Sequence, residues 1–432
     1  FNFSGALEGV SVLNILVYEA LAFLIVFAVL EVLLKVVIFA SGIIEKILRL
    51  YKDYSARFSN YVLKSLIEEI GDKQNIALSP SRLQAILVLL ANWTTPNISR
   101  WILDQAVSDI IDIKEANSLF NNDNTQPIPH KETFRDIDGN PIQMVPTIEQ
   151  QTTLWYKHDL VLNTKAIDNI KNAFHVTANA VDFSDANIKN IIDEEVCKGT
   201  HGLIDRLDTD INAAMLALIV DILYFKGSWE DEFDEYNTKD RMFYGTKGKV
   251  KVPTMLSDGR MDYTETSVYQ AVRLPYTCEG VNHKEFAMRI YLPKNKYGVI
   301  DVLNFIQDEN FELYTERKEV KLSLPRFEVA NNIEVKKLLK QLRLSCVLES
   351  CDIIPQCIKG LQISDISQQV KIKVDEQGTE AAAVTFMAEA GCCPPEVEPT
   401  PKLMKVNKPF LFEIMEETTH TILFSGVINN IE

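Results

Sequence analysis

The sequence predicts an α+β fold in which helices dominate the first third and large mixed or antiparallel β-sheets make up the rest. Helix-spaced apolar residues come early, and short strands separated by turn residues follow them. Residues 216–225 form a run that is apolar on both faces, which is typical of a strand at the centre of a covered sheet. With 432 residues and 47% hydrophobic content, the chain can bury a large core.

A hydrophobic N-terminal extension, residues 1–48, precedes the globular domain that we assign to residues 49–432. Residues 10–44 are overwhelmingly apolar, but three charged residues interrupt them: Glu19, Glu31 and Lys35. The longest uncharged run, residues 20–30, is shorter than the roughly 20 residues that cross a bilayer. Two interpretations stay open, a membrane or targeting helix and a packed hydrophobic extension. Any membrane contact would come from residues 10–44 alone.

The globular domain is expected to begin with two helices. Apolar residues recur at every fourth position of residues 56–70 and predict an amphipathic helix; they are Phe58, Val62, Leu66 and Ile70. Residues 75–78 predict a short buried strand. Ser79 followed by Pro80 is typical of a helix start, because serine caps the first turn and proline fits its first position.

The doubly apolar strand at residues 216–225 contains one acid, Asp221. A buried carboxylate needs hydrogen-bond donors or it takes up a proton. It is either a polar switch point within the sheet or a satisfied core acid, and residue type alone favours the second. Later strands are predicted at residues 242–244, 249–252, 270–274, 286–292 and 321–324, and a closing hairpin at residues 408–414 and 420–424.

A strand near the C-terminus runs into an unusual segment of small residues. Val370, Ile372 and Val374 alternate with lysines at the period of a strand. After them come Gly378 and three consecutive alanines, and the segment ends in a run of Gly, Cys and Pro at residues 391–395. Turn residues on both sides of the alanines disfavour a helix, so we expect a long, extended and exposed loop.

Several classes of function are disfavoured. The net charge of −16, without a sustained basic patch, argues against a nucleic-acid partner. The chain lacks HExxH, GxSxG and GxGxxG motifs, so we expect neither an enzyme nor a bound cofactor. None of the seven cysteines has the spacing of a zinc site, and we expect no metal; they are Cys197, Cys278, Cys346, Cys351, Cys357, Cys392 and Cys393.

Separated segments of the chain, in order, resemble the serpin family over residues 50–432. They occupy residues 75–80, 224–229, 252–255, 274–276, 290–293, 374–385, 407–412 and 426–427. The resemblance implies the serpin fold, with an exposed reactive loop near the C-terminus. It also implies a serine protease inhibitor that acts as a suicide substrate: a protease cleaves the loop and is trapped as an acyl-enzyme while the loop inserts into the main sheet.

The resemblance assigns roles to the small-residue segment. An inserting strand turns alternate side chains inward, which small residues allow, and Gly378 gives the hinge its backbone freedom. The hinge and insertable loop are Glu376, Gly378, Thr379, Ala381, Ala382, Ala383 and Thr385. The family's spacing places the reactive bond at Cys392–Cys393, with Gly391–Cys392 as the alternative. A bond one residue later would put Pro394 after the cut.

The region through which the sheet would open departs from the family. Ser79 and Trp229 match, but Asp221 stands where relatives carry asparagine, Gln368 where they carry histidine, and Arg82 where they carry a second serine. We expect the Gln368 amide to donate a hydrogen bond to Asp221. On this basis we predict that sheet opening is sensitive to pH through Asp221.

The absence of Arg or Lys at the reactive bond disfavours trypsin-like targets. An elastase- or chymotrypsin-like serine protease fits better, and a papain-like cysteine protease is also compatible. The alternative function is a non-inhibitory serpin with a carrier, storage or chaperone role, although the small hinge residues favour inhibition. We expect an extracellular monomer; sequons at Asn2, Asn92 and Asn97 would permit glycosylation.

Overall fold

A computed structural model describes a large part of the chain: residues 54–107, 111–120, 145–160, 168, 171, 174, 176–279, 283–308, 316–342, 344, 363–379 and 400–432. The chain divides into two compact units, Phe1–Tyr51 and Lys52–Glu432, and every described residue belongs to the second. The predicted extension at residues 1–48 lies outside the described residues. Within the described ranges, no helix is long and apolar enough to cross a membrane.

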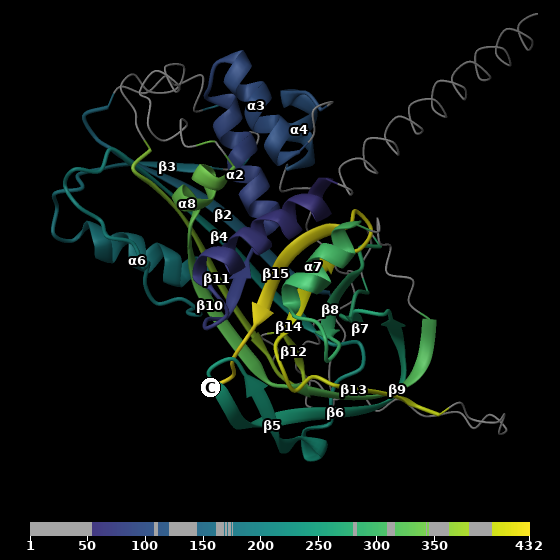
Figure 1. Cartoon of the computed structure of the whole chain (residues 1–432). Coiled ribbons are helices and arrows are strands. Elements are labelled where there is room, and N and C mark those ends of the chain that lie inside the picture. Colours follow the sequence, from purple (N-terminus) through teal and green to yellow (C-terminus); the bar gives the residue numbers. More distant parts are fainter. Residues whose placement is uncertain are drawn as a thin grey trace, which may run out of the picture. The chain divides into compact units, whose positions relative to one another are not determined.

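The strands β5 (Lys239–Gly245), β6 (Gly248–Glu265), β9 (Glu316–Pro325) and β13 (Lys402–Lys405) lie at the end of the domain opposite to α3 (Pro96–Ala106) and α4 (Ile113–Leu119) (Figure 1). Residues 54–70 are helical, as predicted. The helices that follow are α2 (Pro80–Asn92), α3 (Pro96–Ala106), α4 (Ile113–Leu119), α6 (Ile188–Gly199), α7 (Val299–Asp308) and α8 (Val335–Gln341). Ser79 caps α2 by accepting a hydrogen bond from the Arg82 amide, and Pro80 occupies the first position. The predicted start of this helix is confirmed.

A six-stranded sheet is built around the doubly apolar strand. Its order is β10 (Phe327–Glu334), β11 (Asp365–Val374), β12 (Gly378–Thr379), β4 (Ala217–Ser228), β2 (Thr147–Lys157) and β3 (Thr177–Val181). In the half of the sheet nearer α2, β11 and β4 pair directly and in parallel, with Gln368 opposite Asp221. We call the direct pairing of residues 365–369 with residues 218–222 the seam.

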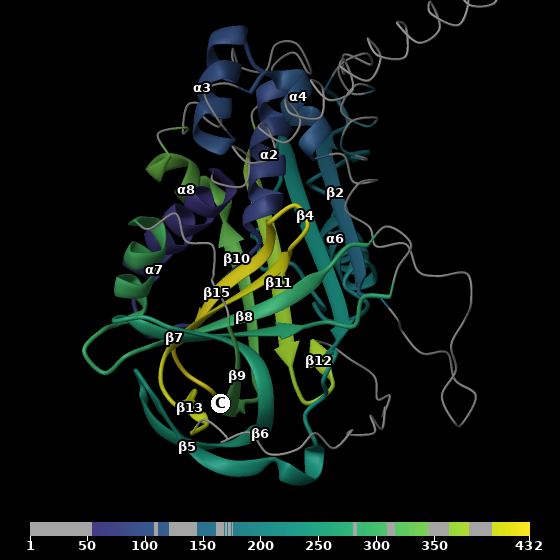
Figure 2. The ribbon, with the colours of Figure 1, turned by 90° about the vertical axis from the view of Figure 1, so that its right-hand side faces the viewer.

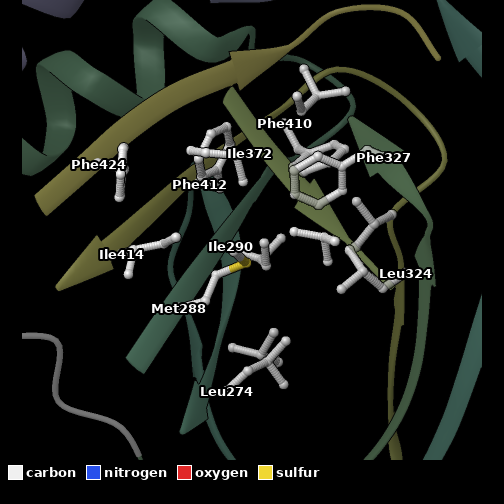
Figure 3. Packing of buried hydrophobic residues seen from close by; sticks show 14 of the residues in the cluster. Leu274, Met288, Ile290, Leu324, Phe327, Ile372, Phe410, Phe412, Ile414 and Phe424 are labelled. Carbon is white, nitrogen blue, oxygen red and sulfur yellow. The ribbon is translucent and has the colours of Figure 1, made fainter. Parts of the chain in front are cut away.

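A nine-stranded sheet packs against the first through a shared apolar core. Its path runs β1 (Ile76–Leu78), β15 (Thr421–Ile428), β14 (Phe410–Glu416), β8 (Phe286–Pro293), β7 (Tyr269–Pro275), β6 (Gly248–Glu265), β9 (Glu316–Pro325) and β13 (Lys402–Lys405), with β5 (Lys239–Gly245) paired to β6. Figure 3 shows Phe410 and Phe412 of β14 close to Phe327 of β10; both ring centroids lie 5.5 Å from that of Phe327. The predicted closing hairpin is β14–β15.

Candidate functional site at the hinge and the seam

The first hinge residues already lie inside the six-stranded sheet. Gly378 and Thr379 form β12, in which Thr379 is opposite Val374 of β11 on one side and opposite Gly227 of β4 on the other. Figure 2 shows this short strand beside the end of β11. Both residues are buried. The sheet is therefore parted at one end, where it holds two residues of the loop, and closed along the seam.

Gly378 is required here by close contact between backbones. Its φ is +154°, and a Cβ on it would lie 2.1 Å from the carbonyl oxygen of Gly227. No side chain can be accommodated at that distance without moving one of the two strands. The predicted hinge glycine therefore has a steric role as well as the conformational freedom expected from the sequence.

Thr379 is held by a tyrosine that sequence reasoning did not single out. Its hydroxyl lies 2.6 Å from the hydroxyl of Tyr276, and both side chains are buried. Burial raises the pKa of Tyr276 above its ordinary value, so the phenol keeps its proton and remains able to donate. The signal was present, since Tyr276 ends one of the segments that resemble the family, but nothing in the sequence linked it to the loop.

Trp229 connects the hinge to β4. Its ring stacks on Tyr276, with centroids 4.6 Å apart and planes 16° apart. The indole Nε1 donates to the carbonyl of Asp375 at 3.0 Å, and the backbone amide of Trp229 donates to the carbonyl of Gln377 at 2.9 Å. These contacts place Trp229 at the point where the loop enters the sheet.

Glu376 is buried just before β12, and a cation neutralises it. The Nε of Arg326 lies 2.8 Å from its carboxylate, and the Thr238 hydroxyl donates a second hydrogen bond. Burial alone would raise the pKa of Glu376, but these hydrogen bonds outweigh it and hold the pKa below its ordinary value. The sequence did not identify Arg326 as the partner of Glu376, because the two residues are 50 positions apart and only the fold brings them together.

The segment between Trp229 and Glu235 is acidic and supports the hinge from the side. The Phe233 amide donates to the carbonyl of Glu376 at 2.9 Å. Nearby, the side chain of Glu232 is exposed, but desolvation by the surrounding protein raises its pKa to about 7, and the neighbouring carboxylates of Glu235 and Asp375 add to this shift. The run of acids at residues 230–232 is typical of a solvated acidic face, and all three residues are exposed.

Asp221 is fully buried and is paired with Arg82 from the first turn of α2. Arg82 Nη2 lies 2.7 Å from one carboxylate oxygen, and Nε lies 3.3 Å from the other. Arg82 also donates to Thr152 and Gln150 of β2, at 2.6 and 2.8 Å, and the Thr152 hydroxyl donates to Asp221 at 2.8 Å. Asp221 is thus a satisfied core acid, as residue type alone favoured.

The predicted hydrogen bond from Gln368 to Asp221 is wrong. The two residues are opposite one another across the seam, but the Gln368 amide donates to the carbonyl of Ser79 at 3.1 Å and its oxygen accepts from the Ser79 amide at 2.9 Å. The physical reason is Arg82, whose charge-assisted hydrogen bonds to the carboxylate are stronger than those of a neutral amide. Two departures from the family, Arg82 and Asp221, therefore compensate one another.

The rest of the predicted loop lies outside the described residues. This holds for the proposed reactive bond and for most of the insertable positions: Cys392, Cys393, Ala381, Ala382, Ala383 and Thr385. Their roles stay predictions. Among the described positions, the structure brings together Glu376, Gly378, Thr379 and Trp229 at one end of the sheet, and Ser79, Asp221 and Gln368 at the seam.

Comparison with known families agrees with this arrangement. The model of the family described as serpin (serine protease inhibitor) matches residues 53–431. The chain belongs to the serpin family. Among serpins of known sequence, it is 27% identical to Iripin-8 of Ixodes ricinus over 397 residues, which cover 87% of this chain and 93% of that protein. It is 31% identical to Serpin-Z1 of Arabidopsis thaliana over 297 residues, which cover 66% and 72% of the two chains.

Solved serpin structures have the same fold. Serpin48 of the insect Tenebrio molitor superposes with a TM-score of 0.73 at 21% identity, covering 88% of this chain and 98% of that one. Thyroxine-binding globulin in complex with thyroxine superposes with a TM-score of 0.72 at 19% identity, covering 88% and 99%. The predicted α+β serpin fold is confirmed.

Proposed function

We propose that this serpin is a protease inhibitor that acts as a suicide substrate and is not itself an enzyme. The observation that carries the proposal is β12: two hinge residues occupy the gap between β11 and β4, and the first inward-facing side chain, Thr379, is small and buried. A sheet that has accepted the start of the loop provides a template on which the rest can add as a strand.

The register of β12 supports continued insertion. Each further loop residue would advance one position toward the start of β4 and of β11. Thr385 lies six residues beyond Thr379. It would therefore lie opposite Asp221, which is six residues before Gly227, and opposite Gln368, which is six residues before Val374. Because side chains alternate along a strand, Ala381, Ala383 and Thr385 would follow Thr379 into the interior. All three are small enough to enter a packed sheet.

The decisive experiment is incubation with purified proteases, followed by denaturing electrophoresis. We expect a covalent complex that survives SDS with an elastase- or chymotrypsin-like serine protease. A papain-like cysteine protease is tested as the second class of target. A trypsin-like protease is tested as the enzyme that we expect to form little or no complex. Loop cleavage by every protease without any covalent complex would overturn inhibition and leave the non-inhibitory carrier, storage or chaperone role.

We also propose that the protein acts outside the cell as a monomer. Asn97 is exposed, whereas the side-chain amide of Asn92 is occupied by hydrogen bonds to the Val88 carbonyl and to Asn117, both at 2.8 Å. Secretion should therefore add a glycan at Asn97. A glycosidase-sensitive mass shift that Asn97→Gln removes and Asn92→Gln retains would support this; an unmodified secreted chain would count against glycosylation at Asn97.

A further inference from the structure

The first turn of α2 reaches across the seam. Thr152, Asp221 and Gln368 are opposite one another on the adjacent strands β2, β4 and β11. Above them, Arg82 contacts Thr152 and Asp221, and Ser79 contacts Gln368. One helical turn is therefore bound on one side to β2 and β4, and on the other side to β11.

Insertion of a strand between β4 and β11 must release one of these two attachments. Neighbouring strands lie about 4.8 Å apart, so a new strand would separate β4 and β11 by about 9.6 Å. Hydrogen bonds require donor and acceptor to lie within about 3.5 Å. A single helical turn cannot keep both sets of contacts across that distance.

The two attachments differ in chemistry. On the β11 side the contacts are between neutral groups: Gln368 and Ser79 exchange two hydrogen bonds, at 2.9 and 3.1 Å. Asn331 of β10, the strand paired with β11, also accepts a hydrogen bond from the Ala77 amide at 2.6 Å and donates one to the Asn75 carbonyl at 3.1 Å. Arg82 and Asp221 form a buried ion pair to which Thr152 adds a further hydrogen bond. Parting the ions would separate two opposite charges in a buried environment, which costs far more than the loss of neutral hydrogen bonds.

We propose that Arg82 fastens α2 to β2 and β4, so that the sheet opens on the other side, where β11 leaves Ser79 and the paired β10 leaves Asn75 and Ala77. Arg82 is in this sense a positioning residue: it decides which strand stays with the helix. The proposal rests on the proposed function, because it concerns the insertion by which the serpin would trap a protease. It is specific to this chain, since it depends on the joint occurrence of Arg82 and Asp221.

Peptide annealing tests the proposal without any protease. A synthetic peptide with the sequence of residues 379–390 is added to the full chain, and its uptake is followed by native electrophoresis and by Trp229 fluorescence. We expect Gln368→Leu to accelerate uptake by about tenfold, because two hydrogen bonds no longer hold β11 to α2. The matched control is Gln369→Leu, which removes the buried neighbouring amide that donates to Ser367 and should leave the rate within about threefold.

The ion pair is tested by replacing both partners together, as Arg82→Ser with Asp221→Asn. Since the pair stays intact during opening, we expect an uptake rate within about threefold of the original protein. A tenfold acceleration would mean that the pair breaks on opening, and would overturn the proposal. No effect of Gln368→Leu would overturn it too, whereas a chain that takes up no peptide at all would overturn the proposed function as well.

A direct measurement covers the case in which the double replacement does not fold. In the arginine-labelled original chain, the Arg82 Nε–H donates to the buried Asp221 carboxylate at 3.3 Å. We expect its NMR signal to stay protected from solvent exchange before and after the peptide is annealed. Loss of protection in the annealed form would show that α2 leaves β4, contrary to the proposal.

Discussion

The hydroxyl groups of Tyr276 and Thr379 lie 2.6 Å apart, in a buried position where β4, β11 and the hinge meet. This contact fixes the first inserted side chain of the loop. It also joins the hinge to Trp229, on which Tyr276 stacks. The hinge is therefore coupled to a small group of buried residues at this end of the sheet.

Thr379→Arg should abolish the proposed inhibition and leave a chain that proteases only cleave. Arginine at this position would have to be buried without a counter-ion, so the hinge would leave the sheet and insertion would stall. The measurement is the ratio of SDS-stable complex to cleaved protein after reaction with the target protease. Thr379→Ser, which keeps the hydroxyl, should retain complex formation; loss of the complex in the serine variant would contradict this explanation.

Tyr276→Phe should loosen the hinge without abolishing the fold. The Thr379 hydroxyl would lose its buried partner, which typically costs about 1–3 kcal/mol. Faster hydrogen exchange of the backbone amides of residues 378 and 379 would report the change. If exchange in this hinge were unaffected, the hydroxyl contact would not be what holds β12.

Gly378→Ala should expel β12 from the sheet. The new methyl group would lie 2.1 Å from the Gly227 carbonyl oxygen at a positive φ, and neither strand can yield by that amount. Increased protease sensitivity of the hinge and altered Trp229 fluorescence would show the expulsion. Gly259→Ala is the control, because a Cβ there meets nothing within 4 Å; an equal response in both variants would point to a general loss of stability.

Arg82→Ser and Asp221→Asn should each be strongly destabilising, but much less so together. Removing one partner of a buried ion pair typically costs about 3–5 kcal/mol, whereas replacing both with neutral groups is often tolerated. Urea unfolding of the two single variants and the double variant measures this. Additive losses in the double variant would show that the two residues do not act as a pair.

The double variant also provides the test of pH-sensitive opening through Asp221, which stays a prediction. Asp221→Asn alone would leave the Arg82 guanidinium buried without its carboxylate, so any change could come from the arginine. The dependence of inhibition on pH should be compared in the original chain and in the double variant between about pH 5 and 7.5. Identical profiles would exclude Asp221 as the sensor.

Glu232→Gln should reduce the pH dependence of stability around the hinge. Desolvation by the surrounding protein, with Glu235 and Asp375 nearby, raises the pKa of this exposed carboxyl to about 7 from an ordinary value of 4.5. Because the pKa is higher in the folded than in the unfolded chain, the protonated carboxyl favours the folded state. This contribution to the free energy of unfolding is fully present below pH 4.5 and is lost as the pH rises through 7. Thermal unfolding at about pH 5 and 7.5 measures the difference. Asp231→Asn, which removes a charge from the adjacent exposed residue, should leave that difference unchanged.

Cys392→Arg should redirect the inhibitor toward trypsin-like proteases. These enzymes require a basic residue before the scissile bond, and the chain has none near residue 392. N-terminal sequencing of the released C-terminal fragment should begin at Cys393. If Gly391→Arg, and not Cys392→Arg, produced the SDS-stable complex, the reactive bond would be Gly391–Cys392.

Local sequence patterns were sufficient for the α+β class and for several individual elements, whereas the serpin fold and the position of the hinge were predicted from the family resemblance. The apolar run of β4, the cap of α2 by Ser79 and the small residues after Val374 are properties of neighbouring residues. The partners of buried polar groups were not predictable in this way. Arg326 lies 50 residues from Glu376, and Arg82 lies 139 residues from Asp221. Nothing in the sequence links Arg326 to Glu376 or Arg82 to Asp221, so the hydrogen bond of Gln368 was predicted with the wrong acceptor.

The presence of β12 has a kinetic consequence. Adding a strand, like forming a helix, is costly at its first hydrogen bonds, because several dihedral angles are fixed for few contacts. Here Gly378 and Thr379 have already made those contacts. They also set the register of the inserting strand. A slip of one residue would turn every side chain to the opposite face of the sheet. Insertion of the rest of the loop would therefore not have to pass through the costly nucleation step. Its rate should then depend on how fast β4 and β11 separate ahead of the loop, residue by residue, and hardly at all on a search for the correct alignment.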